Sequence, residues 1–242
     1  IKLVVDDWEP TAIINTAAMT NVDQCESDRE NCRKLNVDAV YNLYKVCSLR
    51  NIYLAHVSTD FVFDGEDGPY DEKATKNPLS VYATSKSDAE DILEDGDYRG
   101  WSILRTIILF GRGENMSRSN IVLWSMDALA KGQELTIVND QFRAPTWADD
   151  LADACYSACK KRAEGIYHIS GPETFSIYEL VCRVADFFGH DKSLIKPISS
   201  GTLNQAAKRP PRTGFIIEKA QKQLDYHPLT FEESLAELAK QS

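Results

Sequence analysis

The chain has 242 residues, of which 43% are hydrophobic and 26% charged. This composition predicts one or two globular domains with a sizeable core rather than a disordered chain. The formal net charge of −10 repels a phosphate backbone, so we expect no nucleic-acid partner. No apolar run approaches the roughly 20 residues of a membrane span, and the first residues lack the regions of a signal peptide, so we expect a cytoplasmic protein without membrane contacts.

In the first half of the chain, apolar runs alternate with helical patterns. Residues 12–18 (AIINTAA), 52–58 (IYLAHVS) and 101–109 (WSILRTIIL) are typical of buried strands. Between them, residues 26–50 carry apolar side chains at three- and four-residue steps, which predicts an amphipathic helix, and residues 80–94 also read as a helix. This alternation predicts a parallel sheet with right-handed crossovers.

The second half of the chain continues the alternation. Ser176 with Glu179, and Thr230 with Glu233, have the spacing of capping boxes that open two late helices. Gly189 is placed to end the first of these helices. The other predicted elements are helices at 120–131 and 147–160 and strands at 135–138 and 166–169.

The cysteines lie in segments that otherwise read as helices, without a CxxC pair or a histidine at zinc-ligand spacing. We therefore expect small buried thiols in a reducing compartment, and no metal site. The six residues are Cys25, Cys32, Cys47, Cys155, Cys159 and Cys182.

The predicted topology indicates where a ligand should bind. Ligands of open parallel sheets lie beyond the carboxyl ends of the strands, which here means the residues that follow positions 18, 58 and 104. The polar residue Thr59 follows the second predicted strand. This edge of the sheet is therefore the predicted functional site.

Tyr82 and Lys86 are four residues apart on one predicted helix, so their side chains can meet on one face. An ammonium group beside a phenol favours the phenolate and is expected to lower the pKa of Tyr82. Such a phenol can protonate a carbonyl oxygen while hydride reaches its carbon, and Thr59 can hydrogen-bond the same oxygen. This spacing alone is weak, because it recurs by chance on many solvated helices.

Several longer segments occur together with this pair. They are NTAAMTNVD (15–23), STDFVFDG (58–65), YATSK (82–86), LRT (104–106), DQFRAPT (140–146), GIYHISG (165–171) and RP (209–210). In this order, and over nearly the whole chain, they resemble the extended short-chain dehydrogenases/reductases, and specifically the dTDP-4-dehydrorhamnose reductase branch.

The resemblance implies an α/β fold, a Rossmann-type doubly wound parallel sheet with a smaller substrate-binding C-terminal domain. The implied cofactor-binding domain comprises residues 1–112 and 146–170, and the substrate-binding domain comprises residues 113–145 and 171–242. The implied cofactor is NADPH or NADH. The glycine-rich turn that normally holds its pyrophosphate is absent from this sequence, so we expect N-terminal strands that lie outside it.

The resemblance also implies site residues. Tyr82 is the implied proton donor, and Lys86 its activator and a ribose contact. Asn36 is expected to hold the backbone of the active site. The implied catalytic residues are Tyr82, Lys86 and Thr59, the implied cofactor-binding residues are Ala17, Ala18, Met19, Ser58, Tyr82, Lys86 and Arg105, and the implied substrate-binding residues are Thr59, Asp60, Gln141 and Arg209.

The expected function is NAD(P)H-dependent reduction of a nucleotide-linked 4-keto-deoxysugar by a protein that can form a homodimer. Phe61 replaces the tyrosine that commonly follows the STD triplet, and Ile107 and Ile108 replace a tryptophan that packs on the sugar. Two alternatives therefore stay open. One is a non-catalytic regulatory subunit that resembles the methionine adenosyltransferase beta subunit, and the other is a sugar-nucleotide epimerase. The single carboxylate after Thr59, Asp60, argues against dehydratase chemistry.

Overall fold

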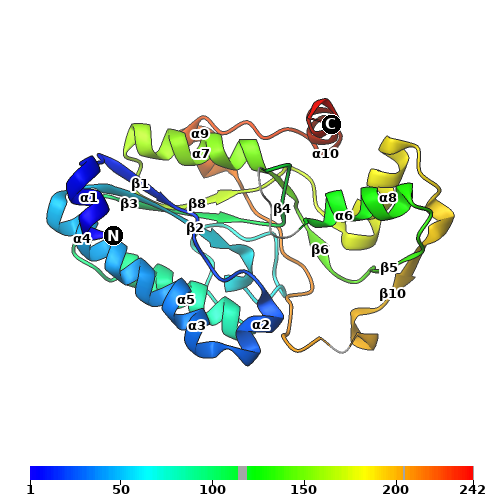
Figure 1. Ribbon diagram of the computed structural model, residues 1–242, viewed down its shortest axis with the longest axis horizontal. Coiled ribbons are helices and arrows are strands. Elements are labelled where there is room, and N and C mark those ends of the chain that lie inside the picture. The colour runs from blue at the N-terminus through cyan, green and yellow to red at the C-terminus, as the bar shows by residue number, and fades with distance from the viewer. Residues whose placement is uncertain (114–118, 204, 242) are drawn as a thin grey trace.

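The computed structural model describes residues 1–113, 119–203 and 205–241 (Figure 1). Within these residues, parallel pairing joins four strands in the order β1-β2-β3-β8. This finding confirms the predicted parallel sheet. The strands are β1 (Ala12–Asn15), β2 (Tyr53–Thr59), β3 (Trp101–Thr106) and β8 (Gly165–Ile169).

Helices cover both faces of this sheet (Figure 1). Alternate residues of a strand point to opposite faces, so Tyr53 of β2 packs against one helical layer and Leu54 against the other. Both side chains are fully buried. The helices on the Tyr53 face are α7 (Ala148–Lys161) and α9 (Glu218–Leu224), and those on the Leu54 face are α1 (Lys2–Trp8), α4 (Ala39–Arg50) and α5 (Val81–Glu94).

A second hydrophobic core lies beside the sheet, at the right of Figure 1. This core includes Phe110 and Trp147, which belong to the range predicted for the cofactor-binding domain. Conversely, α9 packs on the sheet, although it belongs to the range predicted for the substrate-binding domain. The two-domain division stays a prediction, and residues 114–118, 204 and 242 of its second part lie outside the described residues. The core is built on α6 (Ile121–Ala130), α8 (Ile177–Phe188), α10 (Phe231–Lys240) and the parallel pair β5 (Leu135–Val138) and β10 (Ile195–Ile198).

Short elements connect these parts. Leu109 of β4 pairs with Thr146 of β7, and Phe142 of β6 pairs with Ser176 of β9. The short elements are α2 (Val22–Ser27), α3 (Arg29–Arg33), a π-helix (Lys34–Asp38), β4 (Leu109–Phe110), β6 (Phe142–Arg143), β7 (Thr146–Trp147), β9 (Phe175–Ser176) and 3-10 turns at Asp60–Val62, Lys192–Leu194 and Ser200–Thr202.

The helix boundaries agree with the predicted capping signals. Thr230 and Glu233 form a complete capping box at the start of α10, and the Ser176 hydroxyl accepts a hydrogen bond from the Glu179 backbone at the start of α8. Gly189 ends α8 with φ at 71°, in the left-handed region that glycine adopts without strain.

Two predicted elements are shorter than expected. The helix predicted at 26–50 is divided, because the Asp28 side chain accepts a hydrogen bond from the Asn31 backbone and caps a new helix, α3. The strand predicted at 101–109 ends at Thr106, and Ile108 has φ at 32°, outside the extended region.

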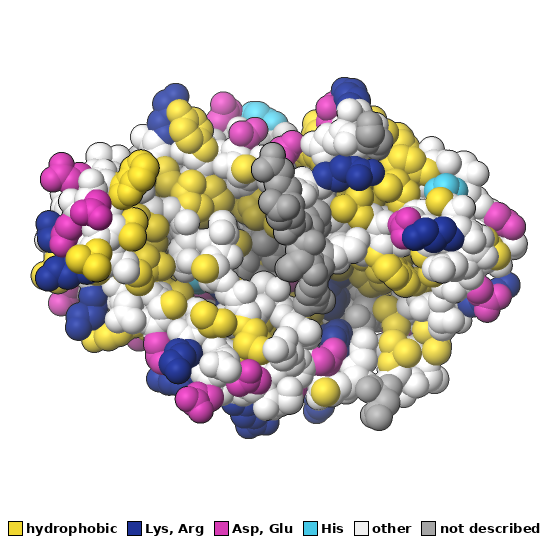
Figure 2. All heavy atoms as spheres, viewed as in Figure 1, with side chains coloured by type: hydrophobic (Ala, Val, Ile, Leu, Met, Phe, Trp, Pro, Cys, Tyr) yellow, Lys and Arg dark blue, Asp and Glu magenta, His cyan; other side chains and the backbone are white. Residues whose placement is uncertain are grey.

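Several large hydrophobic side chains of α1 and β1, including Leu3, Trp8 and Ile14, are exposed. Figure 2 shows hydrophobic atoms at the surface of the lobe that contains these elements. Within the described residues, none of the helices has the length and apolar character needed to cross a membrane. The six cysteines are free; four are buried, as predicted, and Cys159 and Cys182 are half-buried.

Candidate functional site

Tyr82 lies in the first turn of α5, which starts here because the Ser80 hydroxyl accepts a hydrogen bond from the Ala83 backbone. The phenol ring is buried in a small cluster with Cys25 and Cys32. The Phe61 ring contacts it edge-on, with 6.0 Å between the ring centroids. The start of α5 therefore places the Tyr82 side chain beside the segment that follows β2.

Thr59 ends β2, just before the 3-10 turn that carries Phe61. The Thr59 hydroxyl accepts from the Phe61 backbone at 3.2 Å and donates to the Asp60 carboxylate at 3.1 Å. Burial raises the pKa of Tyr82 well above its ordinary value, and the Thr59 hydroxyl opposes this shift. The phenol therefore keeps its proton at neutral pH, the form in which it can act as a proton donor.

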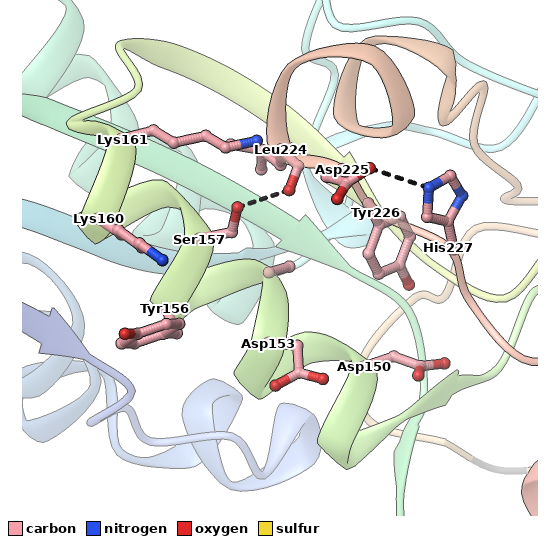
Figure 3. Close-up of a pocket in the computed structure, with 11 residues that line it drawn as sticks. Asp150, Asp153, Tyr156, Ser157, Lys160, Lys161, Leu224, Asp225, Tyr226 and His227 are labelled. Carbon is pink, nitrogen blue, oxygen red and sulfur yellow. Dashed lines mark hydrogen bonds and ion pairs between the residues drawn. The ribbon is translucent and has the colours of Figure 1, made fainter.

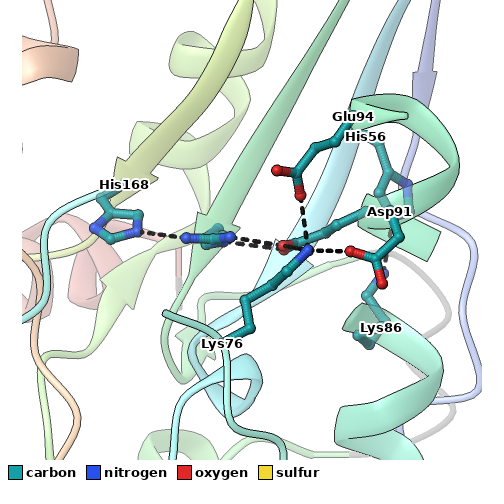
Figure 4. A network of polar contacts seen from close by, with 8 residues as sticks. His56, Lys76, Lys86, Asp91, Glu94 and His168 are labelled. Carbon is teal, nitrogen blue, oxygen red and sulfur yellow. Dashed lines mark hydrogen bonds and ion pairs between the residues drawn. The ribbon is translucent and has the colours of Figure 1, made fainter. Parts of the chain in front are cut away.

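Lys86, one turn further along α5, is almost completely buried. Its Nζ donates to the Val57 carbonyl oxygen at 2.8 Å and lies 3.2 Å from His56 Nε2 (Figure 4). Burial lowers the pKa of Lys86 to about 8, against the opposing charge of Glu90. The prediction that Lys86 lowers the pKa of Tyr82 is wrong for this structure, because burial of the phenol outweighs the other effects.

Asn36 fixes the loop that follows β1. Its Oδ1 accepts from the Met19 backbone at 2.7 Å, and its Nδ2 donates to the Met19 carbonyl at 3.2 Å and to the Ser85 hydroxyl at 2.9 Å. Asn36 lies in the π-helix, an irregularity that is frequent at functional sites. Asn36 therefore holds the backbone of the loop after β1, and the part of this loop in the active site stays a prediction.

The residues around this loop fit a dinucleotide. Ala17 is exposed and Ala18 and Met19 are half-buried, so the loop backbone can be approached closely. The buried Ser58 hydroxyl has no hydrogen-bond partner within the described chain, and buried polar atoms are normally paired. A cofactor hydroxyl or amide would provide the missing partner.

Arg105 does not lie in this group. Its guanidinium is buried and binds both carboxylate oxygens of Glu90, at 3.0 and 2.7 Å, and its NH1 lies 3.3 Å from His168 Nε2 (Figure 4). It also stacks on the Phe63 ring at 5.0 Å. The structure thus corrects the predicted cofactor contact, because these partners hold the guanidinium inside the protein.

Asp60 is buried rather than open to a ligand. The hydroxyls of Thr59 and Thr213 both donate hydrogen bonds to the Asp60 carboxylate. Arg143 Nε lies 3.6 Å from Asp60 Oδ2. Burial raises the pKa of Asp60, whereas Arg143 and these hydrogen bonds oppose the shift. In this geometry the Asp60 carboxylate orients the Thr59 hydroxyl. The predicted contact between Asp60 and the substrate stays a prediction.

The other predicted substrate residues come from the C-terminal half. Gln141 is buried, and its backbone carbonyl accepts from Ile177. Arg209 forms a two-bonded ion pair with Asp23, at 2.7 and 3.2 Å, which lowers the pKa of that carboxyl. A phosphate contact by Arg209 therefore requires this pair to open or to share the guanidinium.

One cavity of about 600 Å³ lies between α7 and the segment that follows α9 (Figure 3). Asp150 and Asp153 of α7 line it on one side, and Asp225 and His227 of the segment after α9 line it on another. It contains none of the predicted site residues. We therefore place the candidate site at the carboxyl ends of β1 and β2.

Three residues of this region were missed by sequence reasoning. Asn15 and His56 connect the β1 loop to Lys86, and Arg143 packs its guanidinium on Phe61 at 5.5 Å beside Asp60. The signal for His56 was available, because a histidine in an apolar strand, two residues before Ser58, shares the face that α5 covers. Arg143 gave no comparable local signal.

Comparisons with known proteins agree with this geometry. The chain is 33% identical over 216 residues to methionine adenosyltransferase 2 subunit beta of Xenopus tropicalis, which matches 87% of this chain and 64% of that protein. The chain thus spans less than two thirds of that relative. It is 30% identical over 237 residues to the probable low-salt glycan biosynthesis reductase Agl14 of Haloferax volcanii, covering 97% and 79% of the two chains.

A solved structure of dTDP-4-dehydrorhamnose reductase from Bacillus anthracis, in complex with NADP, superposes with a TM-score of 0.90. Its sequence is 26% identical, and the match covers 100% of this chain and 84% of that one. The predicted Rossmann-type fold is confirmed. The family model of the RmlD substrate binding domain matches residues 1–242, and the chain therefore belongs to the RmlD substrate binding domain family.

Proposed function

We propose that this protein is an NAD(P)H-dependent reductase of a nucleotide-linked 4-keto-deoxysugar. One observation carries the proposal: Tyr82, at the start of α5, is buried with its ring against Phe61, in the segment that follows Thr59 at the carboxyl end of β2. The relative described as a reductase matches 97% of this chain in sequence, and the solved reductase in complex with NADP matches 100% of it in structure.

Tyr82 supplies the proton in this proposal. The nicotinamide, when bound, supplies hydride to the ketone carbon, and negative charge develops on the ketone oxygen. Because burial raises the pKa of Tyr82, the phenol holds its proton until that charge forms. The Thr59 hydroxyl turns from the Asp60 carboxylate, to which it donates at 3.1 Å in the free protein, and donates a second hydrogen bond to the same oxygen. A positioned general acid of this kind contributes about 10²–10⁴ in rate.

The cofactor side of the site is the β1 loop, with Ser58 and Lys86. The backbone of residues 17–19, which Asn36 holds through Met19, lies against the dinucleotide. The unpaired Ser58 hydroxyl and the Lys86 amine bind its nicotinamide half. On the substrate side, Asp60 and Gln141 border the sugar, and Arg209 binds a phosphate through its planar fork of donors.

The test compares wild type with Tyr82→Phe in the full-length protein. The variant removes one hydroxyl from a packed ring, and we expect turnover to become slower by about two orders of magnitude or more. The control is Tyr41→Phe on the exposed face of α4. Normal turnover by Tyr82→Phe would refute the assignment, and isomerised sugar without net cofactor consumption would indicate an epimerase.

A second candidate function is regulation of another enzyme. The specific observation is the 33% identity to a methionine adenosyltransferase 2 subunit beta. In this case the fold and the cofactor site would serve binding to a synthetase. Copurification with a methionine adenosyltransferase, together with the absence of cofactor oxidation on sugar nucleotides, would favour it. A homodimer stays a prediction, which sedimentation analysis at micromolar concentration can test.

A further inference from the structure

Arg143 of β6 lies buried where three segments of the chain meet. Its Nε lies 3.6 Å from Asp60 Oδ2, in the turn that follows β2. Its NH2 donates to the Pro210 carbonyl oxygen at 2.6 Å, and its NH1 donates to that of Pro211 at 3.4 Å. The Arg143 side chain is 3% exposed, so water scarcely competes for these contacts. One guanidinium therefore joins the end of β2 to residues 207–213 (AKRPPRT), which we call the proline loop.

The proline loop has further contacts with the same two neighbours. The Thr213 hydroxyl donates to the carboxylate that faces Arg143, and the Thr213 N–H donates to the Phe142 carbonyl oxygen at 3.1 Å. The Phe142 N–H donates to the Pro211 carbonyl oxygen at 2.8 Å. Gly65, whose φ is 86°, is so close that a Cβ at this position would lie 2.8 Å from Pro211 Cδ. The loop is therefore packed between β6 and the segment that follows β2.

These contacts reach two parts of the proposed site. The Arg143 guanidinium packs on the Phe61 ring at 5.5 Å, and Phe61 contacts the Tyr82 ring edge-on. The proline loop carries Arg209, the proposed phosphate contact, directly before Pro210. Arg143 is therefore one residue away from the ring that we propose as proton donor, and one residue away from the group that we propose to bind the phosphate.

The contacts of Arg143 need a guanidinium. This group is planar and presents five donors in a fixed fork, so it can face a carboxylate and two carbonyl oxygens at once. A lysine ammonium has the same charge, but it is a point charge with three donors on a flexible stem. A buried ion pair contributes little net stability compared with apolar side chains, because both charges lose their water. The stronger reason for this pair is the defined placement of the segments that it joins.

We propose that Arg143 is a positioning residue, which holds the proline loop, and thereby Arg209, in place relative to the turn at Thr59. It acts through Arg209 and does not touch the reacting atoms. In a nucleotide-linked sugar, the diphosphate and the ketone are separated by a fixed set of bonds. The spacing between Arg209 and Thr59 therefore selects substrates whose ketone reaches Tyr82 while the phosphate is bound. This selection rests on the proposed function, whereas the anchoring of the loop does not.

Limited digestion with trypsin tests the anchoring in the free protein. The exposed Arg212 lies within the proline loop, and cleavage after it requires local opening, so the cleavage rate follows the population of the open form. Arg143→Lys keeps the charge beside Asp60 but lacks the fork. We expect cleavage after Arg212, followed by mass spectrometry, to become about tenfold faster, as for the loss of one charged hydrogen bond. The control Arg105→Lys changes a buried, ion-paired arginine outside the loop and should leave this rate within about twofold of wild type.

Gly65→Ala tests the loop from its other side and leaves the guanidinium unchanged. The added methyl group crowds Pro210 and Pro211, so trypsin should cut the same bond faster, by a similar factor. Equal acceleration in Arg105→Lys would show a general loosening of the protein. A loop that stays protected in both Arg143→Lys and Gly65→Ala would show that these contacts do not hold it. Either result would overturn the proposal.

Binding of dTDP to the full-length protein, measured by calorimetry, tests the step from the loop to Arg209. Arg143→Lys should raise the dissociation constant about tenfold. In an Arg209→Gln background the same substitution should have no further effect, because Arg143 acts through Arg209. Additive losses, an unchanged dissociation constant in Arg143→Lys, or a wild type that does not bind dTDP would overturn the role of Arg143 in substrate binding.

Turnover of a nucleotide-linked 4-keto-deoxysugar separates positioning from support of the fold. In Arg143→Lys, KM should rise about tenfold while kcat stays within about threefold, because Tyr82 and Thr59 keep their places. A lower kcat with unchanged KM would indicate a smaller amount of folded protein and would overturn the positioning role. Absence of turnover in the wild type would refute the proposed function, but the digestion and the binding of dTDP would still decide on Arg143.

Discussion

Replacing Arg105 with methionine tests whether this residue supports the fold or the cofactor. In the structure, Arg105 donates two hydrogen bonds to the buried carboxylate of Glu90, at 3.0 and 2.7 Å. Hydrogen bonds to charged groups contribute about 1.5–3 kcal/mol each, and breaking a buried ion pair costs about 3–5 kcal/mol. Lys76, with its Nζ 3.5 Å from Glu90, keeps one cation beside the carboxylate.

We therefore expect Arg105→Met to lower the free energy of unfolding by about 3 kcal/mol, the lower end of that range. Glu90→Gln should cost at least as much, because the buried Arg105 guanidinium would lose its charged partner and would keep the amide oxygen, His168 and the Phe63 ring. Replacing both residues by apolar side chains of similar volume should recover much of the loss, since no unpaired charge stays buried.

The assay is urea unfolding followed by circular dichroism, with the midpoint and the slope compared between variants. The control is Arg29→Met, which breaks an exposed ion pair with Glu26 and should change stability by less than about 1 kcal/mol. The reasoning is refuted if Arg105→Met lowers the free energy of unfolding by less than about 1 kcal/mol, as expected for an exposed ion pair, while the affinity for NADPH falls strongly. That result would restore the cofactor contact predicted from sequence.

Three further predictions concern other parts of the chain. Asn36→Leu removes the hydrogen bonds that hold the Met19 backbone. The NADPH dissociation constant should therefore rise about tenfold, which corresponds to a loss of about 1.4 kcal/mol in binding free energy. Unchanged binding in a cofactor titration would contradict this role. Burial raises the pKa of Asp150 to about 6, so the folded chain keeps a proton that the unfolded chain releases above about pH 4. Stability should therefore fall as the pH rises from about 4 to about 6. Asp150→Asn should remove that part of the pH dependence, measured by thermal unfolding at pH 4 to 7. Thr230→Ala removes a complete capping box and should cost about 1 kcal/mol in urea unfolding, whereas Thr136→Ala, on an exposed position of β5, lacks this role and serves as the comparison.

Local signals in the sequence were sufficient to place Tyr82, Lys86 and Thr59 on their elements, whereas their catalytic roles stay predictions. The four-residue spacing of Tyr82 and Lys86 requires only a regular helix, and Ser80 opens that helix at the expected position. Thr59 was placed correctly because it follows an apolar run that could only be a buried strand. Asn36 was found through a resemblance, and its local π-helix could not be anticipated from spacing.

Contacts between distant elements could not be predicted in the same way. Arg105 looked like a polar residue at a strand end, but its partner Glu90 comes from a helix, so only the assembled fold shows the ion pair. The pKa of Tyr82 was predicted in the wrong direction, because spacing reveals a neighbouring lysine but not how completely a ring is buried. Arg143 and Thr213 meet Asp60 across long loops for the same reason.

The most direct test follows a deuterium atom through the reaction. NADPH deuterated at the transferable position is mixed with a nucleotide-linked 4-keto-6-deoxysugar and the full-length protein, and the product is analysed by NMR. The account predicts one deuterium at the former ketone carbon for each NADPH consumed, in a reaction that Tyr82→Phe slows by about two orders of magnitude or more. Product without deuterium, or equal rates for the two proteins, would contradict it.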